Sequence, residues 1–175
     1  MKDESMFFIT ETGGFTPLIG SLVCQMNYVR YGTLSSVSEL SKLQLDHLYD
    51  KKSNSIGMLL MHIAMVEKSY QMETFEGLKG EHLKILNPGL DLDETRLAIK
   101  DNPLEYYVNL LNEIRAETLS ELKKRDDQWL KEESIYWDGL NANNWFKWFH
   151  VMEDEINHRG QINWLKKRLP GLGDI

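Results

Sequence analysis

Apolar residues recur every three or four positions in four long stretches of the chain, which are separated by segments richer in glycine, proline and charge. This spacing gathers apolar side chains on one face of a helix, so it predicts four amphipathic helices. We expect them at about residues 17–31, 56–75, 104–125 and 145–169. The first half of the second helix is apolar almost all round, which predicts that it is buried in the core.

Capping residues indicate where these helices begin and end. Serine, threonine or asparagine before a helix, proline at its first position and glycine after its end are the usual signals. Start signals are found at Thr16-Pro17, Ser53–Ser55, Asn102-Pro103 and Asn143 or Asn144, and stop signals at Gly32 and Pro170-Gly171. A shorter helix is expected at 39–48. Residues 126–142, with a turn signal at Asp138-Gly139, predict a short hairpin or an extended loop.

The lengths of the connections predict the topology of the bundle. About twenty residues join the first and second helices, and residues 76–101 join the second and third. Antiparallel neighbours in helical bundles need only about 2–8 linking residues, so the second link is long enough for a crossover. The second and third helices are then expected to run parallel. The predicted fold is an all-α four-helix bundle with long crossover connections, in one domain that spans residues 1–175.

Composition and charge exclude several classes of function. The net charge of −7 gives no basic face for phosphate, so no nucleic acid is expected as a partner. No apolar stretch is long enough to span a membrane, and the N-terminus does not resemble a secretory signal. The single cysteine, Cys24, lies in an apolar context and is expected to be a buried core residue. A chain without an internal disulfide fits a reducing compartment, and a cytoplasmic location is expected.

Candidate chemistry is concentrated in the last helix. His150, Asp154 and His158 are spaced by four residues, and Gln161 falls on the same stripe. Because four residues advance about 40° around a helix, these side chains share one face. Two imidazoles and a carboxylate could form part of a divalent metal site, and His62 in the buried second helix could complete it. The competing interpretation is a solvated polar stripe, with His62 as a hydrogen-bonded core residue.

Two segments resemble the DinB-like superfamily, which includes the damage-inducible DinB proteins, the YfiT-like metal hydrolases and the bacillithiol or mycothiol S-transferases. They are NSIGMLLMHIAMVEKSY at 54–70 and HVMEDEINHRGQINWLKKRLPG at 150–171, and the run His-Arg-Gly-Gln at 158–161 is the most specific part. The resemblance implies that His62 and His158 are metal ligands. It also implies a middle ligand at Asp154, where many members have histidine and a related branch has glutamate.

The resemblance implies a function as well as a site. The cofactor would be a divalent metal ion, with zinc or nickel favoured and manganese or iron as further candidates, since a His₂-carboxylate set suits all four. The activity it favours is a metal-dependent thiol S-transferase that activates a low-molecular-weight thiol for attack on a small-molecule electrophile. The alternatives are a metal-dependent hydrolase and a non-catalytic, stress-related metal-binding or interaction protein.

Five further residues are candidates for supporting the site. His150 is interpreted as a residue of the site wall or as a partner of a ligand. Gln161 and Tyr70 could orient a bound molecule near the mouth of the site. Arg159 could meet a carboxylate of a cofactor, or it could form a salt bridge between helices. Glu67 could accept a hydrogen bond from a ligating histidine, or it could be an exposed acid.

Aromatic residues crowd the start of the last helix. Trp145, Phe146, Trp148 and Phe149 point in nearly all directions around it. One bundle core cannot easily bury all four side chains, so a homodimer that uses helix faces is predicted.

Overall fold

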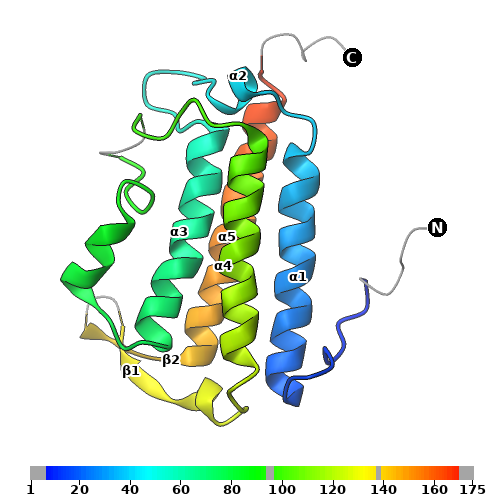
Figure 1. Cartoon of the computed structure of the whole chain (residues 1–175), viewed down its shortest axis with the longest axis vertical. Helices are drawn as coiled ribbons and strands as arrows, with labels where there is room; N and C mark the ends of the chain where they lie inside the picture. Colours follow the sequence, from blue (N-terminus) through cyan, green and yellow to red (C-terminus); the bar gives the residue numbers. More distant parts are fainter. Residues whose placement is uncertain (1–6, 94–96, 137–138, 170–175) are drawn as a thin grey trace.

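The computed structural model describes residues 7–93, 97–136 and 139–169. Four long helices lie side by side in these ranges (Figure 1): α1 (Pro17–Val37), α3 (Ile56–Thr74), α4 (Leu104–Leu122) and α5 (Asn144–Lys166). The short helix α2 (Lys42–Leu45) lies between α1 and α3. The all-α fold is therefore confirmed, with one small sheet added to it.

The bundle contains the predicted crossover. In Figure 1, α1 and α5 run upwards, whereas α3 and α4 both run downwards. The chain returns from the lower end of α3 to the upper end of α4 through a long connection that contains the 3₁₀ helix Gly80–Leu86. After α4, a 3₁₀ turn leads into an antiparallel hairpin formed by β1 (Glu133–Ile135) and β2 (Asn141–Asn143), with Ser134 opposite Ala142. The hairpin prediction is also confirmed.

The core consists of two apolar clusters, one towards each end of the bundle. The first contains side chains from all four long helices and α2, among them Val37, Leu45, Leu59, Leu60, Tyr107, Leu111 and Ile162. The second lies nearer the hairpin and contains Ile19, Leu22, Met26, Leu122, Leu130, Trp148 and Val151. The buried face predicted for the first half of α3 supplies most of its residues to the first cluster.

A layer of four buried charges lies between the two clusters, with one residue from each long helix: Arg30, Glu67, Arg115 and Glu155. Arg30 bonds Glu67 at 2.8 Å and Glu155 at 2.9 Å, and Arg115 bonds Glu67 at 2.7 Å. The spare donors of the arginines reach the backbone carbonyls of residues 26 and 111. The layer has no net charge, and its hydrogen bonds offset the cost of removing four charges from water.

The first helix ends later than its sequence indicates. Gly32 does not stop α1, which continues to Val37. Arg159 of α5 lies against Gly32 and donates a hydrogen bond to the carbonyl of Val29 at 3.3 Å. A Cβ at Gly32 would collide with that guanidinium, so the glycine serves a close approach between helices.

Other boundaries differ in smaller ways. The helix predicted at 39–48 is shorter in the structure, where only α2 is helical. Ser41 and Gln44 form a capping box at its start. Pro103, not Asn102, caps α4, and the Asn102 amide donates to the Tyr107 hydroxyl. Asn143 caps α5 as predicted. The signals at Pro170-Gly171 and at Asp138 lie outside the described residues.

The aromatic residues at the start of α5 have separate environments. Trp148 is fully buried and stacks on Phe75, whereas Trp145, Phe146 and Phe149 are each at least 40% exposed. Cys24 is half-buried, not fully buried as predicted. No helix in the described ranges is long and apolar enough to cross a membrane.

Candidate metal centre

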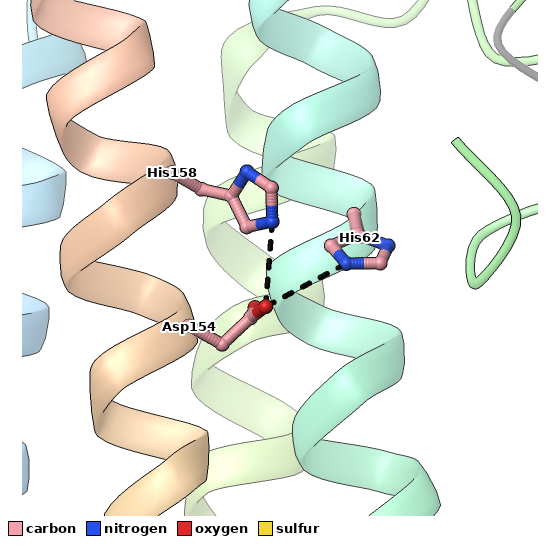
Figure 2. Close-up of side chains that lie close together, drawn as sticks. All are labelled: His62, Asp154 and His158. Carbon is pink, nitrogen blue, oxygen red and sulfur yellow. Dashed lines mark ion pairs between the residues drawn. The ribbon is translucent and has the colours of Figure 1, made fainter. Parts of the chain in front are cut away.

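The structure brings His62, Asp154 and His158 together on facing sides of α3 and α5 (Figure 2). The Oδ1 atom of Asp154 lies 3.8 Å from Nε2 of His62 and 3.4 Å from Nε2 of His158. The three ligand atoms all lie within 4.8 Å of one another. Residues far apart in the sequence therefore form one compact group of three potential ligands.

Both imidazoles are oriented by a hydrogen bond at the other ring nitrogen. Nδ1 of His62 lies 3.0 Å from the carbonyl oxygen of Gly89, and Nδ1 of His158 lies 3.3 Å from Oε1 of Gln161. These oxygens accept, so Nδ1 of each ring is the donor, and Nε2 of each ring faces Asp154. Histidines that bind metals in proteins are commonly held by an acceptor in this way.

The charges in the cluster are coupled. Burial alone would raise the pKa of Asp154, but the neighbouring imidazoles of His158 and His62 outweigh it and hold that pKa well below its usual range. Burial lowers the pKa of His158, but Asp154 more than compensates and raises it. At neutral pH the centre is therefore an anionic carboxylate flanked by two imidazoles, a set that attracts a cation.

The residues present fit a divalent ion. Two ligands about 2.1 Å from a tetrahedral ion are about 3.4 Å apart. The Asp154 oxygen lies 3.4 Å from His158 and 3.8 Å from His62, so small shifts of the side chains would bring the cluster, which spans at most 4.8 Å, to that spacing. The second carboxylate oxygen, Oδ2, is buried and has no hydrogen-bond partner among the described residues. A buried carboxylate oxygen without a partner is costly unless something fills that position. The His/Asp/His cluster could thus hold a metal ion.

An open cleft of about 560 Å³, here called the hairpin cleft, lies directly beside the cluster. His62 and Asp154 form part of its wall, together with residues of α3, the crossover connection, the hairpin and α5. Its other lining residues are Val66, Ser69, Tyr70, Glu73, Lys79, Gly80, Leu83, Leu90, Ile135, Tyr136 and His150. The cluster can therefore be reached from outside, unlike a structural metal site that is sealed by side chains.

Two tyrosines and a histidine form the aromatic part of the hairpin cleft. The hydroxyls of Tyr70 and Tyr136 lie 2.7 Å apart, and His150 packs edge-on against both rings. Burial and the bond to Tyr136 raise the pKa of Tyr70, so its hydroxyl keeps its proton. His150 lies in the wall of the cleft and bonds Glu153, and it is not one of the three clustered residues.

Two of the candidate supporting residues lie away from the cluster. Arg159 faces α1, where it contacts the Val29 carbonyl, and does not line the hairpin cleft. Glu67 is fully buried, and its hydrogen bonds go to the charged layer and Thr118, not to a histidine. The reason is helical phase, because five residues place Glu67 about 140° around α3 from His62. Gln161, by contrast, contacts His158 directly.

Some residues that shape the site have no clear signal in the sequence. Gly89 acts through its backbone carbonyl, which any residue could supply. Tyr136 reaches the hairpin cleft only because the hairpin folds back over α3. Lys147 is a buried lysine of α5 whose ammonium bonds Glu73 at 2.7 Å and Ser134 at 2.6 Å, which ties α5, α3 and the hairpin together. Each depends on contacts between distant segments.

A comparison with known protein families identifies the family of the chain. The family model described as mycothiol S-transferase matches residues 21–171, a range that contains all three clustered residues. No curated protein matches the chain at a significant level. The match covers most of the chain, and it agrees with the DinB-like resemblance of the segments around His62 and His158. The chain therefore belongs to the mycothiol S-transferase family, in the DinB/YfiT-like group.

Proposed function

We propose that this protein is a divalent-metal-dependent S-transferase that joins a low-molecular-weight thiol to a small-molecule electrophile. His62, Asp154 and His158 would hold the ion. When bound, a divalent ion lowers the pKa of a thiol that coordinates it. In the reaction, the S–H bond breaks and its proton passes to solvent, a C–S bond forms, and the leaving group departs with the electron pair of its bond to carbon.

The observation that carries this proposal is that the cluster forms part of the wall of an open cleft. Three protein ligands leave a coordination position for a substrate, as in catalytic zinc sites. The cleft of about 560 Å³ has the size of sites that bind small molecules. A purely structural metal site would be expected to be closed, so the non-catalytic alternative is less well supported.

The residues of the chain have separate parts in this proposal. Asp154 supplies negative charge that offsets part of the charge of the ion. The two imidazoles favour zinc or nickel, and the carboxylate keeps manganese and iron as further candidates. The Tyr70 hydroxyl, which stays protonated, can donate a hydrogen bond to a leaving group or to a carbonyl of the electrophile. Tyr136 and His150 give the electrophile aromatic contacts in the wall of the cleft.

Metal content tests the ligand assignment. The purified protein should carry about one divalent ion per chain by elemental analysis, and His158→Ala should remove most of it because a ligand is lost. His150→Ala is the matched control, since it removes a histidine from the same helix but outside the cluster. Full metal occupancy in His158→Ala would contradict the assignment.

Activity is tested with monochlorobimane as the electrophile and mycothiol, bacillithiol, glutathione or cysteine as the thiol. The metal-loaded protein should accelerate the formation of the fluorescent conjugate with at least one thiol, and His158→Ala should abolish the acceleration. Rates equal to the uncatalysed reaction with all four thiols would contradict the transferase proposal. A metal-dependent hydrolase would instead release a product from ester or amide substrates without any thiol.

A further inference from the structure

A pair of tyrosine hydroxyls, here called the tyrosine pair, lies in the wall of the hairpin cleft. Tyr70 comes from α3 and Tyr136 from the segment between β1 and β2, and their hydroxyl oxygens are 2.7 Å apart. The hydrogen bond between them is only partly buried. Both side chains line the cleft, so the pair borders the space in which a substrate would bind.

The tyrosine pair contains one more hydrogen-bond donor than it uses. Each hydroxyl carries one hydrogen, and only one of the two hydrogens can lie between the oxygens. The other O–H has no acceptor among the residues that the structure describes. This is true whichever tyrosine donates. The pair can therefore donate one O–H to a molecule in the cleft.

The other hydroxyl in the wall of the hairpin cleft is already used. It belongs to Ser69, which donates to the carbonyl oxygen of Val66 in its own helix at 2.7 Å. His150, which packs edge-on against both tyrosine rings, uses Nδ1 on Glu153. Among the described hydroxyls of the cleft, the tyrosine pair is therefore the donor that a ligand can use.

The tyrosine pair lies between the metal cluster and the far end of the cleft. On α3, His62, Val66 and Tyr70 follow one another at intervals of four residues, about 6 Å each along the helix. Helical side chains lean towards the N-terminus, so Tyr70 leans back towards His62. Burial and Tyr136 are the main causes of the raised pKa of Tyr70, and the charge of Asp154 adds to it. A small molecule can therefore lie against the cluster and the pair together.

An O–H donor at this place favours one kind of electrophile. It accelerates a reaction only when the atom it contacts gains negative charge in the transition state. When sulfur attacks an epoxide, a C–S bond forms and the C–O bond breaks with its electron pair going to oxygen. When sulfur attacks an α,β-unsaturated carbonyl compound, the C–S bond forms and the electrons of the C=C bond move towards the carbonyl oxygen. Each adduct then takes up one proton from solvent, which balances the proton lost by the thiol.

We propose that the tyrosine pair is an oxygen-binding site, and that the electrophile is an epoxide or an α,β-unsaturated carbonyl compound. The inference rests on the proposed transferase function and adds to it the class of electrophile. The sulfur approaches from the side of the cluster, while Tyr70 and Tyr136 hold the oxygen that becomes anionic. A chloride leaving group departs as a stable anion and gains less from such a donor.

The test compares electrophiles of the two kinds in variants that lack one or both hydroxyls. The variants are Tyr70→Phe, Tyr136→Phe and the double change, and the matched control is Tyr28→Phe, an exposed tyrosine of α1 that does not line the cleft. Each protein is metal-loaded, and its metal content is checked. The electrophiles are styrene oxide, cyclohexenone and monochlorobimane, with the thiol that wild-type protein uses best, and the conjugates are measured by chromatography.

The loss of kcat/KM should depend on the electrophile. With styrene oxide and cyclohexenone it should be about tenfold in each single variant, because the remaining hydroxyl can still donate, and about a hundredfold in the double variant. With monochlorobimane the loss in the double variant should be at least about ten times smaller. Tyr28→Phe should match wild type with all three electrophiles.

Binding of the product gives a readout that does not depend on turnover. The conjugate of styrene oxide keeps the oxygen as a hydroxyl group next to the new C–S bond. Its calorimetric Kd should rise about threefold to tenfold in the double variant, since a hydrogen bond to the protein is lost. The Kd of the monochlorobimane conjugate should rise by less.

Several results would overturn the inference. Equal losses with the three electrophiles would show that the tyrosine pair only holds the hairpin against α3. Wild-type protein that uses monochlorobimane but neither oxygen electrophile would contradict the inference and leave the proposed function standing. If wild-type protein accelerates no conjugation with any of the thiols, the proposed function itself is wrong and this inference is wrong with it.

Discussion

Glu67→Gln tests whether the buried layer of charges stabilises the bundle. The Glu67 carboxylate is completely buried and accepts hydrogen bonds from Arg30, Arg115 and Thr118. Burial alone would raise the pKa of Glu67, but Arg115 and Arg30 outweigh it and lower it to about 2. The substitution keeps the shape of the side chain and removes its charge. It leaves two buried arginines with Glu155 as their remaining anionic partner in the layer.

The expected cost is large for a single substitution. Lowering a carboxyl pKa from 4.5 to about 2 corresponds to about 3 kcal/mol at roughly 1.4 kcal/mol per unit. Breaking a buried ion pair typically costs about 3–5 kcal/mol, which agrees. For a chain of this length, that lowers Tm by roughly 6–20 °C. Adding Arg115→Met to Glu67→Gln should recover part of the loss, because the unpaired positive charge is then removed.

The dependence on pH gives a second measurement of the same effect. A carboxyl group with a lowered folded-state pKa stabilises the protein fully above its unfolded-state value, and that contribution is lost as the pH falls towards the folded value. The difference in free energy of unfolding between wild type and Glu67→Gln should therefore be constant above about pH 5 and shrink between about pH 4.5 and 2.

Urea denaturation at a series of pH values, with Glu113→Gln as an exposed control on α4, measures both quantities. The control should lie within about 0.5 kcal/mol of wild type. A loss below about 1 kcal/mol for Glu67→Gln at pH 7, or a difference that does not change with pH, would refute this account of the layer.

Three further predictions follow from other features. Asp154→His should keep the metal and move the pH–rate profile to lower pH, because imidazole offsets less of the ion's charge than a carboxylate does. Asp154→Asn should weaken metal binding without abolishing it. Titration with zinc measures the binding of both variants, and the pH dependence of the rate measures the shift. The exposed side chains of Trp145 and Phe149 predict a homodimer, so light scattering should give twice the mass of one chain at micromolar concentration. After both residues are changed to glutamate, it should give the mass of a monomer. Gly57→Ala should destabilise the protein by about 1–3 kcal/mol, since a Cβ there would lie 2.7 Å from the hydroxyl of a buried tyrosine of α4. Gly160→Ala, in open space, should stabilise it by about 0.5–1 kcal/mol by thermal melting.

Much of the fold could be predicted because helix periodicity and start signals are local. The end of α1 could not, because glycine is an ordinary stop signal, yet α1 continues past Gly32 to Val37. The contact of Arg159 with Gly32 comes from the far end of the chain and has no local signal. The position of Glu67 could not be predicted either. Its partners come from two other helices, and a charged residue in an amphipathic helix normally faces water.

The candidate site was predictable only in part. Spacing placed Asp154 and His158 on one face, and the buried His62 was a candidate to complete the site from another helix. The resemblance to a family then implied that His62 is a ligand. Spacing alone was equally compatible with a solvated polar stripe. The hairpin cleft could not be predicted, because it depends on how the crossover connection and the hairpin fold over α3. The contact of His62 with the Gly89 carbonyl could not be predicted either, because a backbone carbonyl has no signature in the sequence.

The crossover topology has a consequence for the order of events during synthesis. His62 lies in the first half of the chain and His158 close to its end, with α4 and the hairpin made between them. At about 5–20 residues per second, several seconds or more separate the two histidines at the ribosome. Until α5 emerges, His62 lacks the two other residues of the cluster. Under the proposed function, the metal site can therefore be completed only after α5 has left the ribosome.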